Sequence, residues 1–208
     1  MDKMVQRAYS FEIRAENNES NGDHIVGRPI VYESVTDLGW FDEVIEAGAL
    51  DNTDLRDVRF LVNHNTDMIP LARSRNNNEN STMQMTVDEE GMSIRVNLDT
   101  DNNSEAKNLY SAIKRGDISG MSFMFSINDE EWQDLESDHP TRRIREIGRV
   151  LEVSAVTFPA YEATTISARD IEALESAKAL LESKRSQALE SAKAEVELAK
   201  IKLSVLCE

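Results

Sequence analysis

The chain has 208 residues and a formal net charge of −16 at pH 7. Nucleic-acid surfaces need patches of Lys and Arg, so this charge argues against a nucleic-acid binder. No apolar run approaches the roughly 20 residues that a membrane span needs, and we expect no secretory signal at the N-terminus. The single cysteine, Cys207, argues against a disulfide framework and a cysteine metal cluster.

In chain order, the first half of the sequence is typical of short strands separated by polar loops. Pro29 suggests an edge or a bulge in one strand, and Gly91 marks the turn of a hairpin. Alternation of apolar and polar residues predicts strands over 5–15, 25–32, 82–87 and 92–98, together with the apolar stretch VRFLVNHN. Polar loops are expected at 16–23 and 73–80.

The second half opens with a helix, for which Ser104 is the expected N-cap and Gly116 the expected stop. The run SGMSFMF then alternates, which places Ser122 on one face of a strand and Phe123 on the other. A serine just after a glycine at the beginning of a strand is expected to be open to a ligand. A polar excursion over 128–141 precedes a strand that ends near Phe158.

Many short strands and few helices predict an α+β fold that is mainly β. We expect a closed or curled antiparallel β-barrel with peripheral helices over residues 1–168. Residues 169–208 are expected to form a long helical extension, because the composition there is rich in Ala, Leu, Glu and Lys and lacks glycine and proline.

The C-terminal helix carries an apolar seam at steps of three and four, which indicates a docking face or a weak oligomer. The seam is interrupted by Lys178 and Arg185, and a plain surface helix is the alternative interpretation. A helix of this length is not stable by propensity alone. The seam residues are Leu189, Ala192, Val196, Ala199, Leu203 and Leu206.

A serine is a poor nucleophile unless a base lies within hydrogen-bond reach and a third group orients that base. Ser122 is the leading candidate, with Ser119 and Ser126 as competitors. His64 is the candidate base, because it follows an apolar strand, although a single histidine in this position is more often structural.

Glu152 is the candidate third group. Alternation places it on one face with Val150 and Ser154, where a buried carboxylate is costly unless it is paired. The partner is either an imidazole N–H, which would orient the base, or an arginine from the 142–145 stretch. The residues alone do not decide between these.

The ordered set FLVNHN, a hairpin, a helix ending RGDISGMSFMF, and RVLEVSAVTFPAY resembles the prohead maturation proteases of tailed bacteriophages. Those enzymes share a fold with the herpesvirus assemblins. The upstream GRPIVYESVTDLGWFDEVIEAGAL also resembles the family, so the likeness covers about residues 8–168. Two departures are Leu50, where phenylalanine is expected, and Met124, where glycine is common and a larger side chain would narrow the site.

The resemblance implies a serine endopeptidase that needs no cofactor, with Ser122 as nucleophile, His64 as base and Glu152 where the herpesvirus relatives use a second histidine. Backbone N–H groups of 160–162 would bind the oxyanion. The substrates and docking partners would be the major capsid protein or a scaffold protein, and the chain itself. The enzyme would work inside the prohead, in the host cytoplasm, and a homo-oligomer is left open.

The rival interpretation is a non-enzymatic assembly module, a β-domain with a helical arm that scaffolds capsid subunits. Burial of Ser122, or a hydroxyl turned away from His64, would favour this rival. A metal hydrolase is a weaker candidate, because one histidine and scattered carboxylates do not form a ligand set.

Overall fold

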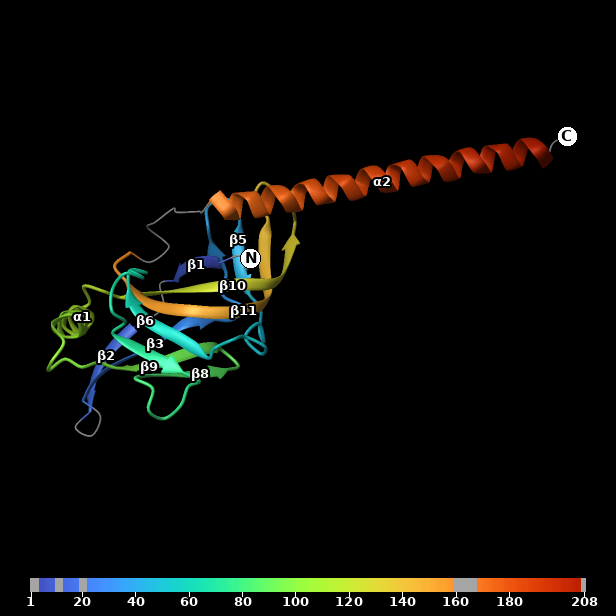
Figure 1. Ribbon diagram of the computed structural model, residues 1–208. Coiled ribbons are helices and arrows are strands. Elements are labelled where there is room, and N and C mark those ends of the chain that lie inside the picture. Colours follow the sequence, from blue (N-terminus) through green and yellow to red (C-terminus); the bar gives the residue numbers. More distant parts are fainter. Residues whose placement is uncertain (1–3, 10–12, 19–21, 159–167, 207–208) are drawn as a thin grey trace.

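Two β-sheets and two helices make up the computed structural model, which describes residues 4–9, 13–18, 22–158 and 168–206 (Figure 1). The helices are α1 (Ser104–Arg115) and α2 (Ala168–Leu206). The larger sheet contains β1 (Met4–Tyr9), β4 (Thr36–Asp37), β5 (Asp42–Ile45), β6 (Asp57–Val62), β7 (Ala72–Arg75), β10 (Gly120–Gln133) and β11 (Thr141–Val156). The smaller sheet contains β2 (Ile13–Asn18), β3 (Gly22–Val31), β8 (Met83–Asp88) and β9 (Gly91–Asn97).

The larger sheet is organised around β11. One edge of β11 pairs antiparallel with β10, and the other edge pairs in parallel with β5 at residues 141–144 and with β6 at residues 152–155. Because one long edge serves two strands in succession, the sheet branches instead of closing. Of the predicted closed or curled antiparallel barrel, the closed form is therefore wrong, whereas the mainly β, α+β class with a C-terminal helix is confirmed.

The core lies between the two sheets and is completed by one face of α1. Met121, Phe123 and Phe125 project into it from β10, and the two phenylalanine rings stack with centroids 4.7 Å apart. This confirms the predicted alternation of the SGMSFMF run. Burying each such side chain stabilises the fold by roughly 1.5–3 kcal/mol.

Bulges in the pairing of β11 with β10 set which residues face the core, and two of them, at Gly148 and Leu151, lie nearest the candidate site residues. At the first, Gly148 is skipped in the pairing with β10, and a Cβ there would lie 2.3 Å from the Asn128 side-chain oxygen. At the second, Leu151 is skipped, so that Glu152 pairs with Met124 while Val150 joins the core. The predicted shared face of Val150 and Glu152 is wrong, since a bulge shifts the alternation by one residue.

The other predicted elements are mostly found. The strand predicted over 5–15 is instead two strands, β1 and β2, in different sheets. The β8–β9 hairpin is confirmed, and the β3 bulge falls at Pro29. The side chain of Asn103, not Ser104, caps α1, whose end is fixed by Gly116 with φ +80°. The predicted loop at 73–80 begins with the end of β7, and β10 continues to Gln133 into the predicted excursion.

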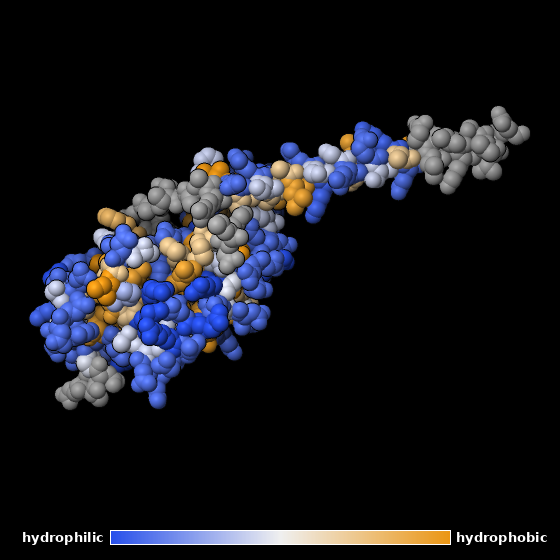
Figure 2. Space-filling model, in the orientation of Figure 1, coloured by the Kyte–Doolittle hydropathy of each residue, from blue (hydrophilic) through white to orange (hydrophobic). Residues whose placement is uncertain are grey.

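Helix α2 begins on the body and then projects from it (Figures 1 and 2). Asp170, Ala173 and Leu174 are buried, and Arg185 forms an ion pair with Glu136 of the β10–β11 hairpin. Further along, the exposed surface of the helix is mostly hydrophilic, with isolated apolar residues such as Leu189. Neither α1 nor α2, the helices of the described residues, has the length and apolar character that crossing a membrane requires.

A buried ionic cluster joins the first strand, the start of α2 and the β10–β11 hairpin. Arg7 binds both oxygens of Glu43 and lies 2.8 Å from Asp170 Oδ1. Arg142 lies 3.1 Å from the same Asp170 oxygen and also bonds Glu130. Burial lowers the pKa of Arg7, but the charges of Glu43 and Asp170 and the bonds to them raise it above its usual range, so this guanidinium stays charged.

Replacement of Glu43 by Gln should destabilise the protein by about 3–5 kcal/mol, because it leaves two buried guanidinium groups with too little negative charge. Urea unfolding followed by circular dichroism measures this. Glu46→Gln is the matched control: its partner Arg143 is partly exposed, so the loss should stay below about 1 kcal/mol. Equal losses in the two variants would contradict a special role for the buried cluster.

Candidate active site

His64 lies in a tight turn directly after β6, at the edge of the larger sheet. Asn63 and His64 both have positive φ, +51° and +56°, which is uncommon for residues other than glycine. The turn is held to the end of β11: the Asn63 N–H donates to Ala155 O at 2.9 Å, and its side chain exchanges two hydrogen bonds with Thr157. Parallel pairing of β6 with residues 152–155 of β11 therefore fixes His64 above that strand.

The imidazole of His64 is paired with the carboxylate of Glu152. The distance from His64 Nδ1 to Glu152 Oε1 is 2.5 Å, and the side chain of Glu152 is only 3% exposed. An ionised carboxylate only accepts, so the proton in this bond belongs to Nδ1, and in the neutral form of the ring Nε2 then carries the lone pair. The arginine alternative is not what the structure shows, since Arg142, Arg143 and Arg145 pair with other acidic residues.

Ser154 adds a third group to this pair, although no sequence pattern had indicated a role for it. Its hydroxyl donates to Glu152 Oε2 at 2.5 Å and accepts from the His64 backbone N–H at 3.1 Å. The available signal was two polar residues, Glu152 and Ser154, spaced by two in the otherwise apolar stretch 150–156 of β11.

Ser122 lies on β10 between β1 and β11, directly opposite Ala8 on one side and Ser154 on the other. It is fully buried, and its Oγ donates to the carbonyl oxygen of Arg7 at 2.7 Å. Within the described residues no hydrogen bond joins Ser122 to His64. The prediction that Ser122 is open to a ligand is therefore wrong, because its side chain is fully buried and its hydroxyl is bonded to a backbone carbonyl of β1.

The remaining predicted site residues do not join this group. Ser119 is exposed in the bend before β10, and Ser126 is buried further along the strand. His24, which was not a predicted site residue, is buried in β3, where its ring nitrogens face Gly22 O and Glu16. The predicted oxyanion donors at 160–162 lie outside the described residues.

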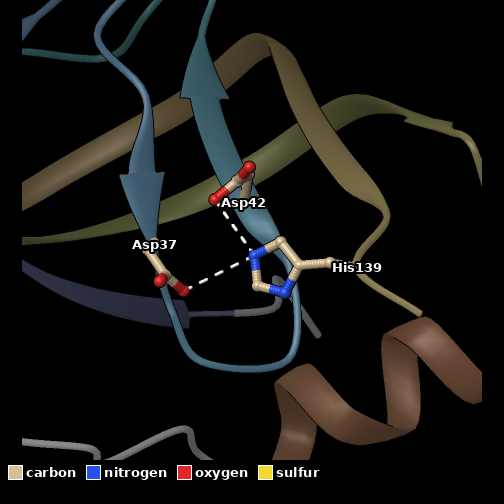
Figure 3. Close-up of side chains that lie close together, drawn as sticks. All are labelled: Asp37, Asp42 and His139. Atoms are coloured by element: carbon tan, nitrogen blue, oxygen red, sulfur yellow. Dashed lines mark hydrogen bonds and ion pairs between the residues drawn. The ribbon is translucent and has the colours of Figure 1, made fainter. Parts of the chain in front are cut away.

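A second cluster of polar side chains lies at the opposite end of β11 from Glu152 (Figure 3). His139 Nε2 is 3.1 Å from Asp42 Oδ1 and 3.5 Å from Asp37 Oδ1, and the three ligand atoms lie within 4.8 Å of one another. One histidine and two carboxylates could in principle hold a divalent transition metal. Contacts between the imidazole and the two carboxylates account for the arrangement, and nothing further about it points to a ligand.

Comparison with known proteins decides the family. The family model described as caudovirus prohead serine protease matches residues 9–177, which is most of the chain. The chain belongs to this family. The resemblance seen in the sequence motifs is thereby confirmed at the level of the family.

Two individual relatives accompany this match. The prohead protease of Enterobacteria phage HK97 is 30% identical over 139 residues, which cover 64% of this chain and 56% of that protein. The chain thus matches little more than half the length of this relative. The structure of the bacteriophage T4 capsid assembly protease is 12% identical, covers 76% of this chain and 98% of that chain, and has a TM-score of 0.43. The assemblin-like fold stays a prediction.

Ser122→Ala should leave the fold intact and lower the free energy of unfolding by about 1 kcal/mol, the net value of the hydrogen bond to Arg7. Ser74→Ala is the control, since the buried Ser74 hydroxyl has no hydrogen-bond partner in the part of the chain that the structure describes, and its removal should cost nothing. Denaturant unfolding of both variants checks this. Loss of the cooperative transition in Ser122→Ala alone would show that this hydroxyl is indispensable to the fold.

Proposed function

We propose that this protein is a serine endopeptidase that cleaves scaffold protein or the scaffolding segment of a capsid protein, and itself, during prohead maturation. The observation that carries the proposal is the hydrogen bond from His64 to the buried carboxylate of Glu152, in a chain of the prohead serine protease family. Such a pair is the base and its orienting group in serine proteases of several unrelated folds.

In the proposed mechanism Ser122 attacks the peptide carbonyl while His64 Nε2 takes its proton. Glu152 keeps the proton of the neutral imidazole on Nδ1, so that Nε2 is the acceptor, and stabilises the imidazolium once it forms. The protonated His64 then gives its proton to the leaving amine, and water hydrolyses the acyl-enzyme.

For this chemistry the Ser122 hydroxyl has to exchange one partner for another. It now donates to Arg7 O, and catalysis requires it to donate to His64 Nε2. A neutral hydrogen bond contributes only about 0.5–1.5 kcal/mol net, so rotation of the hydroxyl is energetically modest. Catalytic hydrogen bonds are often long or misaligned until the substrate binds.

The second candidate function is a non-enzymatic capsid-assembly module. A specific observation favours it: Ser122 is fully buried, and its hydroxyl points to Arg7 O instead of His64. In this alternative the His64–Glu152 pair serves only to satisfy a buried carboxylate. Family membership favours the enzyme, and the cleavage experiment below separates the two.

The name of the relative from phage HK97, a prohead protease, supports a proposal for the substrate and the location. We propose that the major capsid protein or a scaffold protein is the substrate and docking partner, and that cleavage takes place inside the prohead in the host cytoplasm. Residues 1–168 would be the protease domain. Residues 169–208 would form an arm that docks on the scaffold or on a second copy.

Ser122→Ala and His64→Gln should each abolish cleavage when the protein is co-expressed with its cognate capsid protein, with a loss of several orders of magnitude in rate. Intact mass spectrometry of both proteins measures the shortening and locates the cut sites. His139→Gln is the matched control, because His139 is paired with carboxylates at the other end of β11. This variant should cleave at the wild-type rate.

Two outcomes would count against the peptidase. If Ser122→Ala still cleaves at the wild-type rate, the nucleophile is another residue. If wild type and Ser122→Ala give identical masses while particles still assemble, the assembly module is the better account.

The docking arm can be tested without disturbing the body. Because α2 packs on the body at Asp170 and Leu174 and reaches Glu136 through Arg185, removal of the whole helix would damage the domain. The double variant Leu189→Glu, Val196→Glu places two charges on the exposed apolar seam. We expect less incorporation into proheads and unchanged cleavage of free capsid protein.

Ser191→Glu with Ala194→Glu is the control for this variant, since it adds the same charge to other faces of the helix. Quantitative gel analysis of purified proheads gives the amount of enzyme per particle. Wild-type incorporation of the seam variant would remove the support for a docking arm.

A further inference from the structure

Ser154 occupies the middle of the candidate site. On β11, Ser154 pairs with Leu61 of β6 on one side and with Ser122 of β10 on the other. Leu61 precedes His64 by three residues. Its side chain is fully buried. We propose that Ser154 is a positioning residue that holds Glu152 and His64 in their working geometry, an inference that rests on the function proposed above.

The hydroxyl of Ser154 makes two hydrogen bonds that serve two different residues. It donates at 2.5 Å to Glu152 Oε2, the oxygen that His64 does not use, and it accepts at 3.1 Å from the His64 backbone N–H. A hydroxyl has one donor and two acceptor positions, so both bonds exist together.

The first bond fixes the carboxylate. With Oε2 bound to Ser154, Glu152 can present only Oε1 to the imidazole, and the plane of the carboxylate cannot turn. A fixed acceptor opposite Nδ1 keeps the proton of the neutral His64 ring on that nitrogen. Nε2 is then left free to act as the base.

The second bond fixes the backbone of His64. The residue has φ +56°, in the left-handed region that a side chain disfavours, and it persists only where the surroundings hold it. Ser154 binds the N–H of His64 while Glu152 binds its ring. His64 is thus held at two points by two residues of the same strand.

The simpler account is that Ser154 merely satisfies buried polar groups. Ser74 provides a comparison, because it is also a fully buried serine on a strand of the same sheet and its hydroxyl has no hydrogen-bond partner among the described residues. The protein therefore tolerates a buried serine hydroxyl that holds nothing in place. A positioning role predicts effects on His64 that a loss of stability alone would not produce.

The experiment compares full-length wild type with Ser154→Ala. The ¹⁵N shifts of the His64 ring, recorded above its titration range, report which nitrogen carries the proton. We expect the wild-type ring to be protonated on Nδ1 and the Ser154→Ala ring to show a mixture of tautomers. The single-turnover rate of capsid-protein cleavage should fall, by less than the roughly 10⁴-fold loss that follows replacement of a triad carboxylate.

Three further variants sharpen this comparison. Ser154→Thr keeps the hydroxyl and should restore the wild-type tautomer and most of the rate. Ser74→Ala should change neither measurement. If Ser154→Ala does not fold, Ser154→Cys conserves the volume and weakens both bonds, and it should show the same direction of change.

A wild-type His64 tautomer and cleavage rate in a folded Ser154→Ala or Ser154→Cys protein would overturn the proposal. The result is distinguishable from failure of the proposed function. If Ser122→Ala abolishes cleavage while Ser154→Ala does not slow it, only the positioning role is lost. If the wild type does not cleave at all, the proposed function is lost, and the tautomer comparison still tests the positioning of His64.

Discussion

The buried carboxylate of Glu152 is the constraint on which the site depends. A carboxylate whose side chain is 3% exposed has lost its hydration, and its burial is tolerable only if hydrogen bonds replace the water. His64 and Ser154 supply three contacts between them: two reach the carboxylate, and the third joins Ser154 to the His64 backbone. The hydrogen bonds that the Glu152 carboxylate requires thereby fix the position of Ser154 and the orientation of the His64 imidazole, and Ser154 in turn fixes the turn after β6.

A carboxylate can occupy this place because β11 is irregular. Val150 and Val153 both face the core, and strict alternation would not allow residues three apart to do so. The bulge that skips Leu151 resolves the conflict and turns Glu152 to the face opposite the core. The same strand offers its other edge to β5 and then to β6, and the β6 pairing brings His64 within reach. The bulge and the branched pairing are therefore both conditions of the site.

Sequence patterns predicted individual residues and local elements of the site better than the strand pairings that bring them together. His64 and Glu152 could be chosen because histidine is rare and a carboxylate in an apolar strand needs a partner. The helix α1, the β8–β9 hairpin and the long C-terminal helix follow from local signals that act over a few residues. The prediction of a closed barrel was wrong because strand order depends on which strands pair across long distances in the sequence. The bulge at Leu151, the split of residues 5–15 into two strands and the role of Ser154 likewise arise from contacts between distant segments.

Two movements could make Ser122 available for catalysis, and they differ in energetic cost. Rotating the hydroxyl from Arg7 O toward His64 breaks one neutral hydrogen bond, about 1 kcal/mol net. Exposing Ser122 by moving β1 would cost more, because the Arg7 side chain is bonded to Glu43 and to Asp170 at the start of α2. Breaking a buried pair of this kind costs roughly 3–5 kcal/mol. Arg7 therefore couples the environment of Ser122 to the seating of α2, because the carbonyl that accepts from the serine and the guanidinium that binds Asp170 belong to one residue.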